Sequence, residues 1–171
     1  HHLLFDETDI KNYRTFFKLR PPLRSNSDKL FLLQYIKDST LDTISSFHLP
    51  QDEESKRLPF ERAAFGAIGL QTLLPACLKL VNDKIIDLPQ LFRKISLNPA
   101  KILNIKSGIL EEGYFADLVL FDPYKPLLID RFNLLSKAKN TPFDGYQLFG
   151  EVLKTFVGGR EIYKSRNIND T

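Results

Sequence analysis

The stretch that decides the fold is Leu41–Gln51, which reads Leu-Asp-Thr-Ile-Ser-Ser-Phe-His-Leu-Pro-Gln. Its first half, with Thr43 and Ile44, is typical of a buried β-strand, and its second half carries polar side chains on either side of Pro50. A long apolar helix is predicted to follow over residues 59–81. A strand that ends in polar residues and is followed by a helix is the repeating unit of an α/β barrel, where chemistry lies at the carboxyl ends of the strands. The sequence therefore predicts a site at the end of this stretch.

The flanking sequence supplies further elements on both sides. Pro21-Pro22 ends a predicted short strand, because proline cannot join a central ladder. Gly158-Gly159 separates two β-type runs and predicts a tight hairpin. The other predicted elements are a strand over 16–19, helices over 28–37 and 88–97, a charged loop over 52–57, a short helix from Asn98-Pro99, and strands over 116–122, 151–157 and 160–163. The chain is therefore predicted to be α/β over 1–105 and mostly β over 106–171.

Composition limits the classes of function. The chain has 171 residues, of which 43% are hydrophobic and 26% are charged, as in a globular protein rather than a disordered one. The net charge of +3 is small, and Lys and Arg alternate with Asp and Glu, which argues against a nucleic-acid partner. No apolar run reaches the ~18 residues of a membrane span, and no signal peptide is recognised, so we expect a cytoplasmic protein without a membrane partner. The single cysteine, Cys77, lies in an apolar run and is predicted to be a buried thiol rather than a reactive one.

The number of strands is too small for a whole barrel. A barrel needs eight strands in about 250 residues, and only two barrel-type strands precede the β-rich part of this sequence. Both faces of these strands would lack partners in an isolated piece. We therefore expect that further chain, or another polypeptide, completes the barrel.

Several motifs, in one order along nearly the whole chain, carry a resemblance to a known family. They are His1-His2-Leu3-Leu4, Pro21-Pro22-Leu23-Arg24, Leu41–Pro50, Pro59-Phe60-Glu61, Ala64-Phe65-Gly66, Asn98-Pro99-Ala100, Ala116-Asp117-Leu118-Val119, Ser136–Phe143 and Val157-Gly158-Gly159. In these motifs the chain resembles the C-terminal part of the bacterial dihydroorotases, which are metal-dependent amidohydrolases of pyrimidine biosynthesis. The resemblance implies an α/β fold, the C-terminal part of a (β/α)8 metal-dependent hydrolase barrel followed by strands of a small β-sandwich. Residues 1–105 would belong to the barrel, and 106–171 to the composite β-sandwich with a C-terminal tail.

The resemblance also implies a chemistry and shows where this sequence departs from it. The family uses two divalent metals, usually zinc, to generate a hydroxide, and an Asp that binds metal and moves a proton. Its motif Asp-His-Ala-Pro-His corresponds here to Phe47-His48-Leu49-Pro50-Gln51. Phe47 therefore occupies the position of the family's catalytic Asp. A phenyl ring can neither bind metal nor carry a proton. Gln51 replaces a substrate-contacting His.

The resemblance leaves a partial substrate site. Arg20 stands at the position of a substrate-binding Asn, and Phe65 and Gly66, which offer backbone to the substrate in the family, are kept. The expected substrate-binding residues are thus Phe65, Gly66, Arg20 and Gln51, with no catalytic and no metal-binding residue. No cofactor is expected on this chain itself, and zinc only if the protein is active.

Four residues keep alternative interpretations. His48 is either a packed or capping histidine or a metal ligand. Phe47 is either a core or pocket-filling ring or a contact for an apolar ligand. Arg20 and Arg24 are either surface arginines or, with the backbone of Phe65 and Gly66, an anion site.

Three functions follow. The first is a non-catalytic dihydroorotase-like protein that serves as a scaffold or regulatory partner, for example of aspartate transcarbamoylase, or that forms a homo-oligomer. It would pair with the missing N-terminal barrel portion of the same protein. The alternative is an active zinc-dependent cyclic amidohydrolase that interconverts dihydroorotate and carbamoyl aspartate, with the metal ligands supplied by that N-terminal part. The third is a small-molecule binding module that uses the degenerate pocket, with Arg20 and Gln51 in contact with an anion.

Overall fold

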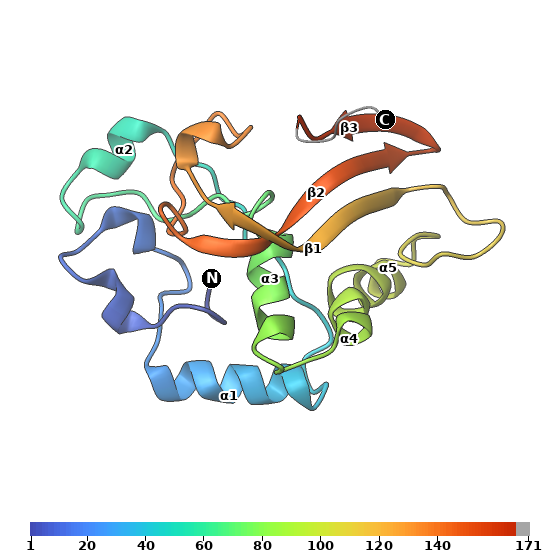
Figure 1. Cartoon of the computed structure of the whole chain (residues 1–171). Helices are drawn as coiled ribbons and strands as arrows, with labels where there is room; N and C mark the ends of the chain where they lie inside the picture. The colour runs from blue at the N-terminus through green and yellow to red at the C-terminus, as the bar shows by residue number, and fades with distance from the viewer. Residues whose placement is uncertain (167–171) are drawn as a thin grey trace.

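The computed structural model describes residues 1–166 of the chain. Short helices precede a twisted antiparallel sheet, which runs over α3 in Figure 1, while α1 lies across the far end of α3. The helical elements are η1 (Glu7–Ile10), η2 (Thr15–Phe17), α1 (Asn26–Lys37), α2 (Glu53–Arg57), α3 (Leu73–Asn82), α4 (Leu88–Phe92), a π-helical turn η3 (Arg93–Leu97), α5 (Asn98–Ile102) and η4 (Arg131–Asn133). The strands are β1 (Leu118–Leu128), β2 (Gln147–Val157) and β3 (Arg160–Lys164).

The sheet follows the β-type runs of the sequence. Its three strands are in the order β1-β2-β3, and both pairs are antiparallel. Val157 pairs with Arg160 across the turn, so the hairpin predicted at Gly158-Gly159 is confirmed. The β1–β2 pairing shifts register between Asp122 and Pro126, where proline interrupts the ladder.

Helix α3 lies between two hydrophobic clusters. Its residue Ala76 packs into the first cluster and Cys77, Leu78 and Leu80 into the second. Burial raises the pKa of the Cys77 thiol to about 12, as expected for a buried cysteine rather than a reactive one. The first cluster contains Phe5, Phe17, Leu19, Leu23, Ala67, Ala76, Ile129, Phe143 and Leu148, and the second contains Ile36, Cys77, Leu78, Leu80, Ile86 and Leu91.

The sheet approaches α3 closely at one glycine. Gly150 of β2 has φ +105°, and a Cβ at this position would overlap the side chain of Leu78. Leu78 is 1% exposed, so it has little room to move. The absence of a side chain at residue 150 therefore lets the sheet rest on the helix.

Two predicted strands of the barrel part are not ladder strands. Residues 16–19 begin instead in the short helix η2. The segment 41–46 is extended but unpaired, and its neighbourhood contains one parallel bridge, between His48 and Ala67. A strand is defined by its neighbours, and an isolated segment cannot show the ladder that its pattern predicts. The parallel bridge is the type of pairing found between neighbouring strands of a β/α barrel.

Two further predictions were wrong in detail. The predicted helix over 59–81 is helical only from Leu73, because the amides of Gly66 and Ile68 donate to the carbonyls of Lys18 and Asn140 instead of to a helix. The predicted charged loop over 52–57 contains α2, which begins after Asp52, whose carboxylate accepts from the Ser55 amide.

The division at residue 105 stays a prediction, since the first hydrophobic cluster includes residues from both sides of it. The expected C-terminal tail includes residues 167–171, which lie outside the described part of the chain. Among the described residues, no helix is long and apolar enough to cross a membrane.

Candidate functional site

The candidate site is built from two extended loops that run side by side, 46–51 and 65–69. The Leu49 amide donates to the Ala67 carbonyl over 2.8 Å, next to the parallel bridge of His48 with Ala67. Neither loop has a further ladder partner among the described residues. Contacts from outside the two loops must therefore fix their positions.

One buried asparagine supplies these contacts. The Asn140 side chain is almost completely buried, and its Nδ2 donates to the carbonyls of Leu49 at 3.2 Å and Gly66 at 3.1 Å. Its Oδ1 accepts from the Gln51 amide at 3.2 Å, and its own carbonyl accepts from the Ile68 amide at 2.9 Å. A single residue thus holds both loops in register, and every polar atom of its side chain has a partner.

Gly66 is required by its conformation and its neighbours. Its φ is +124°, a region that favours glycine, and a Cβ would come within 2.7 Å of the Leu49 carbonyl oxygen. Its amide donates to the Lys18 carbonyl, and its carbonyl receives the bond from Asn140. The backbone of Gly66 is therefore fixed from three sides.

The ring of Phe65 lies beneath two cationic groups. The Lys18 Nζ is 4.6 Å from the ring centroid and the Arg20 Cζ is 5.9 Å from it. The Lys18 ammonium also donates to the Glu61 carbonyl at 2.8 Å. Three of the four expected substrate-binding residues, Arg20, Phe65 and Gly66, thus lie together, and Gln51 joins them through Asn140.

A second buried lysine supports the same loop. The Lys56 side chain is buried, and its Nζ donates to the Ala64 carbonyl at 2.8 Å. Burial, together with the nearby Lys18 charge, lowers the pKa of Lys56 to about 8. Lys56 therefore holds the backbone immediately before Phe65.

Phe47 has an unusual backbone for its residue type. Its φ is +50°, in the left-handed region, and its side chain is 58% exposed. The ring meets His2 edge-on, with 6.5 Å between centroids, and the His2 Nε2 lies 3.0 Å from the Pro21 carbonyl. Burial lowers the pKa of His2, which favours the neutral ring. Among the described residues Phe47 is thus a surface ring beside His2 and not a core ring.

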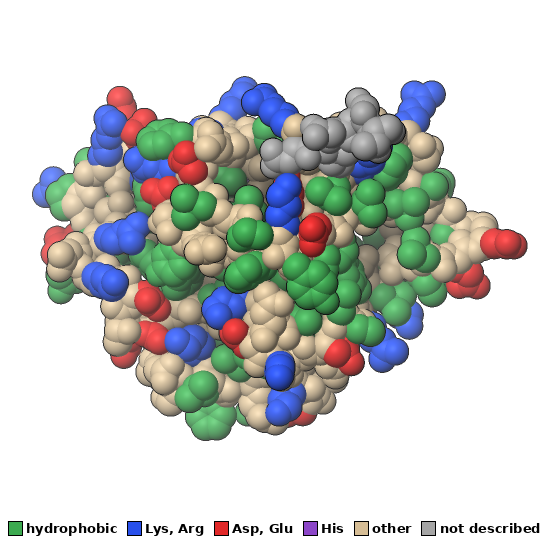
Figure 2. Space-filling view, in the orientation of Figure 1, with side chains coloured by type: hydrophobic (Ala, Val, Ile, Leu, Met, Phe, Trp, Pro, Cys, Tyr) green, Lys and Arg blue, Asp and Glu red, His purple; other side chains and the backbone are tan. Residues whose placement is uncertain are grey.

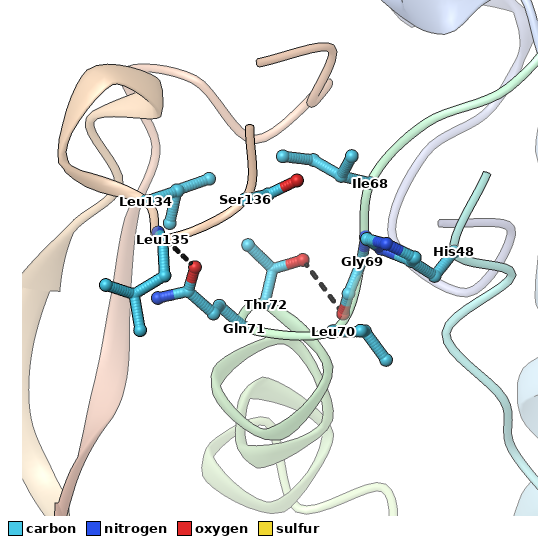
Figure 3. A pocket seen from close by; sticks show the side chains of 9 residues that line it. All are labelled: His48, Ile68, Gly69, Leu70, Gln71, Thr72, Leu134, Leu135 and Ser136. Carbon is cyan, nitrogen blue, oxygen red and sulfur yellow. Dashed lines mark hydrogen bonds between the residues drawn. The ribbon is translucent and has the colours of Figure 1, made fainter. Parts of the chain in front are cut away.

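His48 is held as a capping histidine. The Gly69 amide donates to its Nδ1 over 3.1 Å, so the neutral ring carries its proton on Nε2. The ring faces a cavity of about 260 Å³ between the 68–72 and 134–136 segments (Figure 3). The Gln71 side chain closes one side of the cavity by accepting from the Leu135 amide, and most of the other lining is apolar.

The described residues do not form a metal site by themselves. Within residues 1–166, no three His, Cys, Asp or Glu side chains come together in a way that could hold an ion. Phe47 has no donor atom, and the Nδ1 of His48 is already occupied by the Gly69 amide. The zinc that the resemblance implies does not fit the described residues alone.

Comparison with known proteins identifies the family. The model of the amidohydrolase family matches residues 60–162, which is more than half of the chain. The chain belongs to the amidohydrolase family. It is also a homologue of dihydroorotases: it is 42% identical over 164 residues to the dihydroorotase of Syntrophus aciditrophicus and 37% identical over 169 residues to that of Ehrlichia canis.

Solved structures agree with this amidohydrolase assignment. The L-hydantoinase (dihydropyrimidinase) of Arthrobacter aurescens matches with a TM-score of 0.90 and 28% identity, over 95% of this chain and 38% of that one. A D-hydantoinase matches with a TM-score of 0.87 at 22% identity, over 96% of this chain and 38% of its own, which supports the fold alone. The match to the Syntrophus aciditrophicus dihydroorotase includes 96% of this chain, and the match to the Ehrlichia canis dihydroorotase includes 98% of it. In both cases the chain spans only 38% of the relative's length. It therefore has part of an amidohydrolase fold, with mixed helices and a three-stranded antiparallel sheet.

Sequence reasoning missed the residues that hold this site together. Asn140, Lys18 and Lys56 are not among the expected site residues. The only available signal for Asn140 was its place in the Ser136–Phe143 motif of the resemblance, because its partners lie 74 to 91 residues away in sequence. Arg24 faces Asp28 at 3.8 Å and no described contact joins it to Phe65 or Gly66.

Proposed function

We propose that this chain is the C-terminal part of a dihydroorotase-like protein that has lost catalysis and serves as a scaffold or regulatory partner in pyrimidine biosynthesis. The observation that carries the proposal is the left-handed backbone at Phe47. Asp and Asn tolerate this conformation far better than a bulky aromatic residue does. The backbone at residue 47 thus suits the Asp of the family motif, while the side chain has become one that cannot bind metal or transfer a proton.

The surrounding geometry supports loss of a functional group rather than collapse of the site. Gly66 keeps its positive φ, and Asn140 keeps both loops in register. A protein that retains this framework can still recognise a ligand or a partner at the same surface. Arg20, beside Phe65, and Gln51 would then contact a ligand without hydrolysing it.

The exposed apolar surface supports a partner that completes the fold. Val119, Leu120 and Ile162 are 51%, 52% and 63% exposed, and Figure 2 shows hydrophobic side chains gathered where β1 and β2 run. A cavity of about 540 Å³ lies between β1 and the segments around α4. Large apolar patches usually mark surfaces that another part of a protein covers. We assign this surface to the missing part of the same protein, which would complete the composite β-sandwich and the barrel; high hydrogen exchange at β1 in the complete protein would contradict that assignment.

One observation favours the active alternative. The proteins compared above, at 37% and 42% identity, are named dihydroorotase. In this alternative the protein is a zinc-dependent cyclic amidohydrolase whose metal ligands lie in the rest of the barrel. Proton transfer would then need a group other than Phe47. If the protein is instead a non-catalytic scaffold, as proposed above, its expected partner is aspartate transcarbamoylase or a second copy of the protein.

The test is metal content and dihydroorotate hydrolysis, measured on the complete protein and its Phe47→Asp variant. We expect the wild type to show no turnover, and Phe47→Asp to gain metal or activity if the remaining ligands are present. Phe47→Asn is the matched control, because it suits the same backbone but carries no charge. Turnover by the wild type with about two metals per chain would overturn the proposal and favour the active alternative.

A further inference from the structure

A second cavity lies beside the candidate site and is lined by an unusual set of charges. It measures about 400 Å³ and lies between α2 and the 131–140 segment, the teal helix and the orange segment in the upper part of Figure 1. Its charged lining consists of four cationic side chains, Lys56, Arg131, Lys137 and Lys139, and two acidic ones, Asp52 and Glu53. Arg20, Phe65 and Gly66 do not line it.

Both acidic side chains already have partners. The Glu53 carboxylate pairs with Arg57 at 2.7 Å, one turn further along α2. The Asp52 carboxylate accepts from the Ser55 amide at 2.7 Å as the cap of the same helix, and this hydrogen bonding lowers its pKa. The charge of Glu53 is therefore balanced by Arg57, whereas Asp52 serves as a helix cap and keeps its negative charge, so the cationic side chains of the lining still outnumber the unbalanced acidic one.

The cationic side chains retain unused donors. Lys137 has no ion pair or hydrogen bond within residues 1–166. Lys139 uses one donor on the Leu134 carbonyl at 2.7 Å, and Lys56 uses one on the Ala64 carbonyl. Because an ammonium group has three donors, each of these two lysines keeps capacity for another acceptor.

Arg131 is held rigidly at the wall of this cavity. Its guanidinium Cζ lies 5.1 Å from the Phe16 ring centroid and 4.6 Å from that of Phe132. Its Nε is buried without a hydrogen-bond partner but forms an ion pair with the Asp144 carboxylate, at 3.6 Å, so the other guanidinium nitrogens remain for an anion in the cavity. Contacts with two aromatic rings restrain the position of the guanidinium, and a guanidinium is well suited to recognise a carboxylate or phosphate.

We propose that this cavity binds a small anion that carries a carboxylate or phosphate group. Arg131 and Lys137 supply the main contacts, and Lys139 adds a further donor. Gln51 and Asn140 form part of the same wall, so a bound anion lies next to the hydrogen bond between the Asn140 Oδ1 and the Gln51 amide. The proposal does not depend on whether the protein is catalytic.

The test is isothermal titration of the complete protein with inorganic phosphate and with succinate, at constant ionic strength in chloride. We expect saturable binding of at least one of them. Stronger binding of phosphate identifies a phosphate-bearing ligand, and stronger binding of succinate identifies a carboxylate-bearing one. Lys137→Ala should weaken binding about tenfold, the loss expected for one charge-assisted contact. Lys137 is exposed, so this variant is expected to fold.

Two further variants make the test decisive. Arg131→Met keeps an apolar contact with the two phenyl rings but removes the guanidinium, and it should also weaken binding about tenfold. Lys101→Ala removes an exposed charge from α5, outside this cavity, and should leave affinity unchanged. Absence of saturable binding for both anions, or an equal loss in Lys101→Ala, would overturn the proposal.

Discussion

The candidate-site loops and the C-terminal sheet are stabilised in opposite ways. Within residues 1–166, loops 46–51 and 65–69 have only one β-bridge, yet a single buried side chain, Asn140, makes three hydrogen bonds to them. The sheet has a regular antiparallel ladder but leaves apolar side chains such as Leu120 and Ile162 exposed. The loops thus depend on a few contacts between residues distant in sequence, whereas the sheet depends on many contacts between neighbouring strands.

The two regions should therefore respond differently to substitutions. A loop pair held mainly by Asn140 should keep its backbone geometry when the exposed side chain of Phe47 or the half-buried one of Gln51 changes, because those side chains make few of the structural contacts. The sheet holds its shape by backbone pairing and offers its apolar face to further chain. In the loops, we expect a large loss in the free energy of unfolding at a few positions, such as Asn140, and little loss elsewhere. In the sheet, we expect smaller losses spread over more positions.

The largest effect is expected from Asn140→Asp. The change replaces Nδ2, which donates to the Leu49 and Gly66 carbonyls, with an oxygen that repels them in a buried position. We expect the free energy of unfolding to fall by about 3 kcal/mol or more, measured by denaturant titration of the complete protein. Asn26→Asp makes the same chemical change at an exposed helix start and should alter stability by less than about 0.5 kcal/mol. Equal effects would mean that the loops do not depend on Asn140.

A smaller effect is expected in the sheet from Gly150→Ala. The added methyl group would overlap Leu78, and the backbone has φ +105°. Together these should lower the free energy of unfolding by about 2 kcal/mol, which thermal or chemical denaturation can measure. Gly145→Ala is the matched control, because residue 145 has φ +82° but no atom within 4 Å of the added group. A loss at residue 150 no greater than that at residue 145 would show that contact with α3 contributes little.

The same difference explains what the sequence could predict. The hairpin at residues 158 and 159 and the strands on either side follow from local β patterning and turn chemistry, and they were predicted within a few residues. The segments 41–46 and 59–72 were not, because their conformation depends on hydrogen bonds to Lys18, Lys94 and Asn140, which no local pattern contains. The expected substrate-binding residues were found by resemblance, and their contacts show them close together. Their function stays a prediction.

The smallest effect is expected at Phe47, and it tests whether the site loops still favour the residue that the family motif places there. Phe47→Asn should raise the free energy of unfolding by up to about 1 kcal/mol, because Asn tolerates a φ of +50° better than Phe and the 58% exposed ring buries little surface. Phe65→Asn is the matched control: it makes the same chemical change at a residue without a positive φ and removes the ring beneath Lys18, so it should destabilise the protein. If both variants lower the melting temperature equally, the ring at residue 47 stabilises the loops more than its backbone strains them. The backbone argument for a lost aspartate would then fail, while the framework around Asn140 would stand.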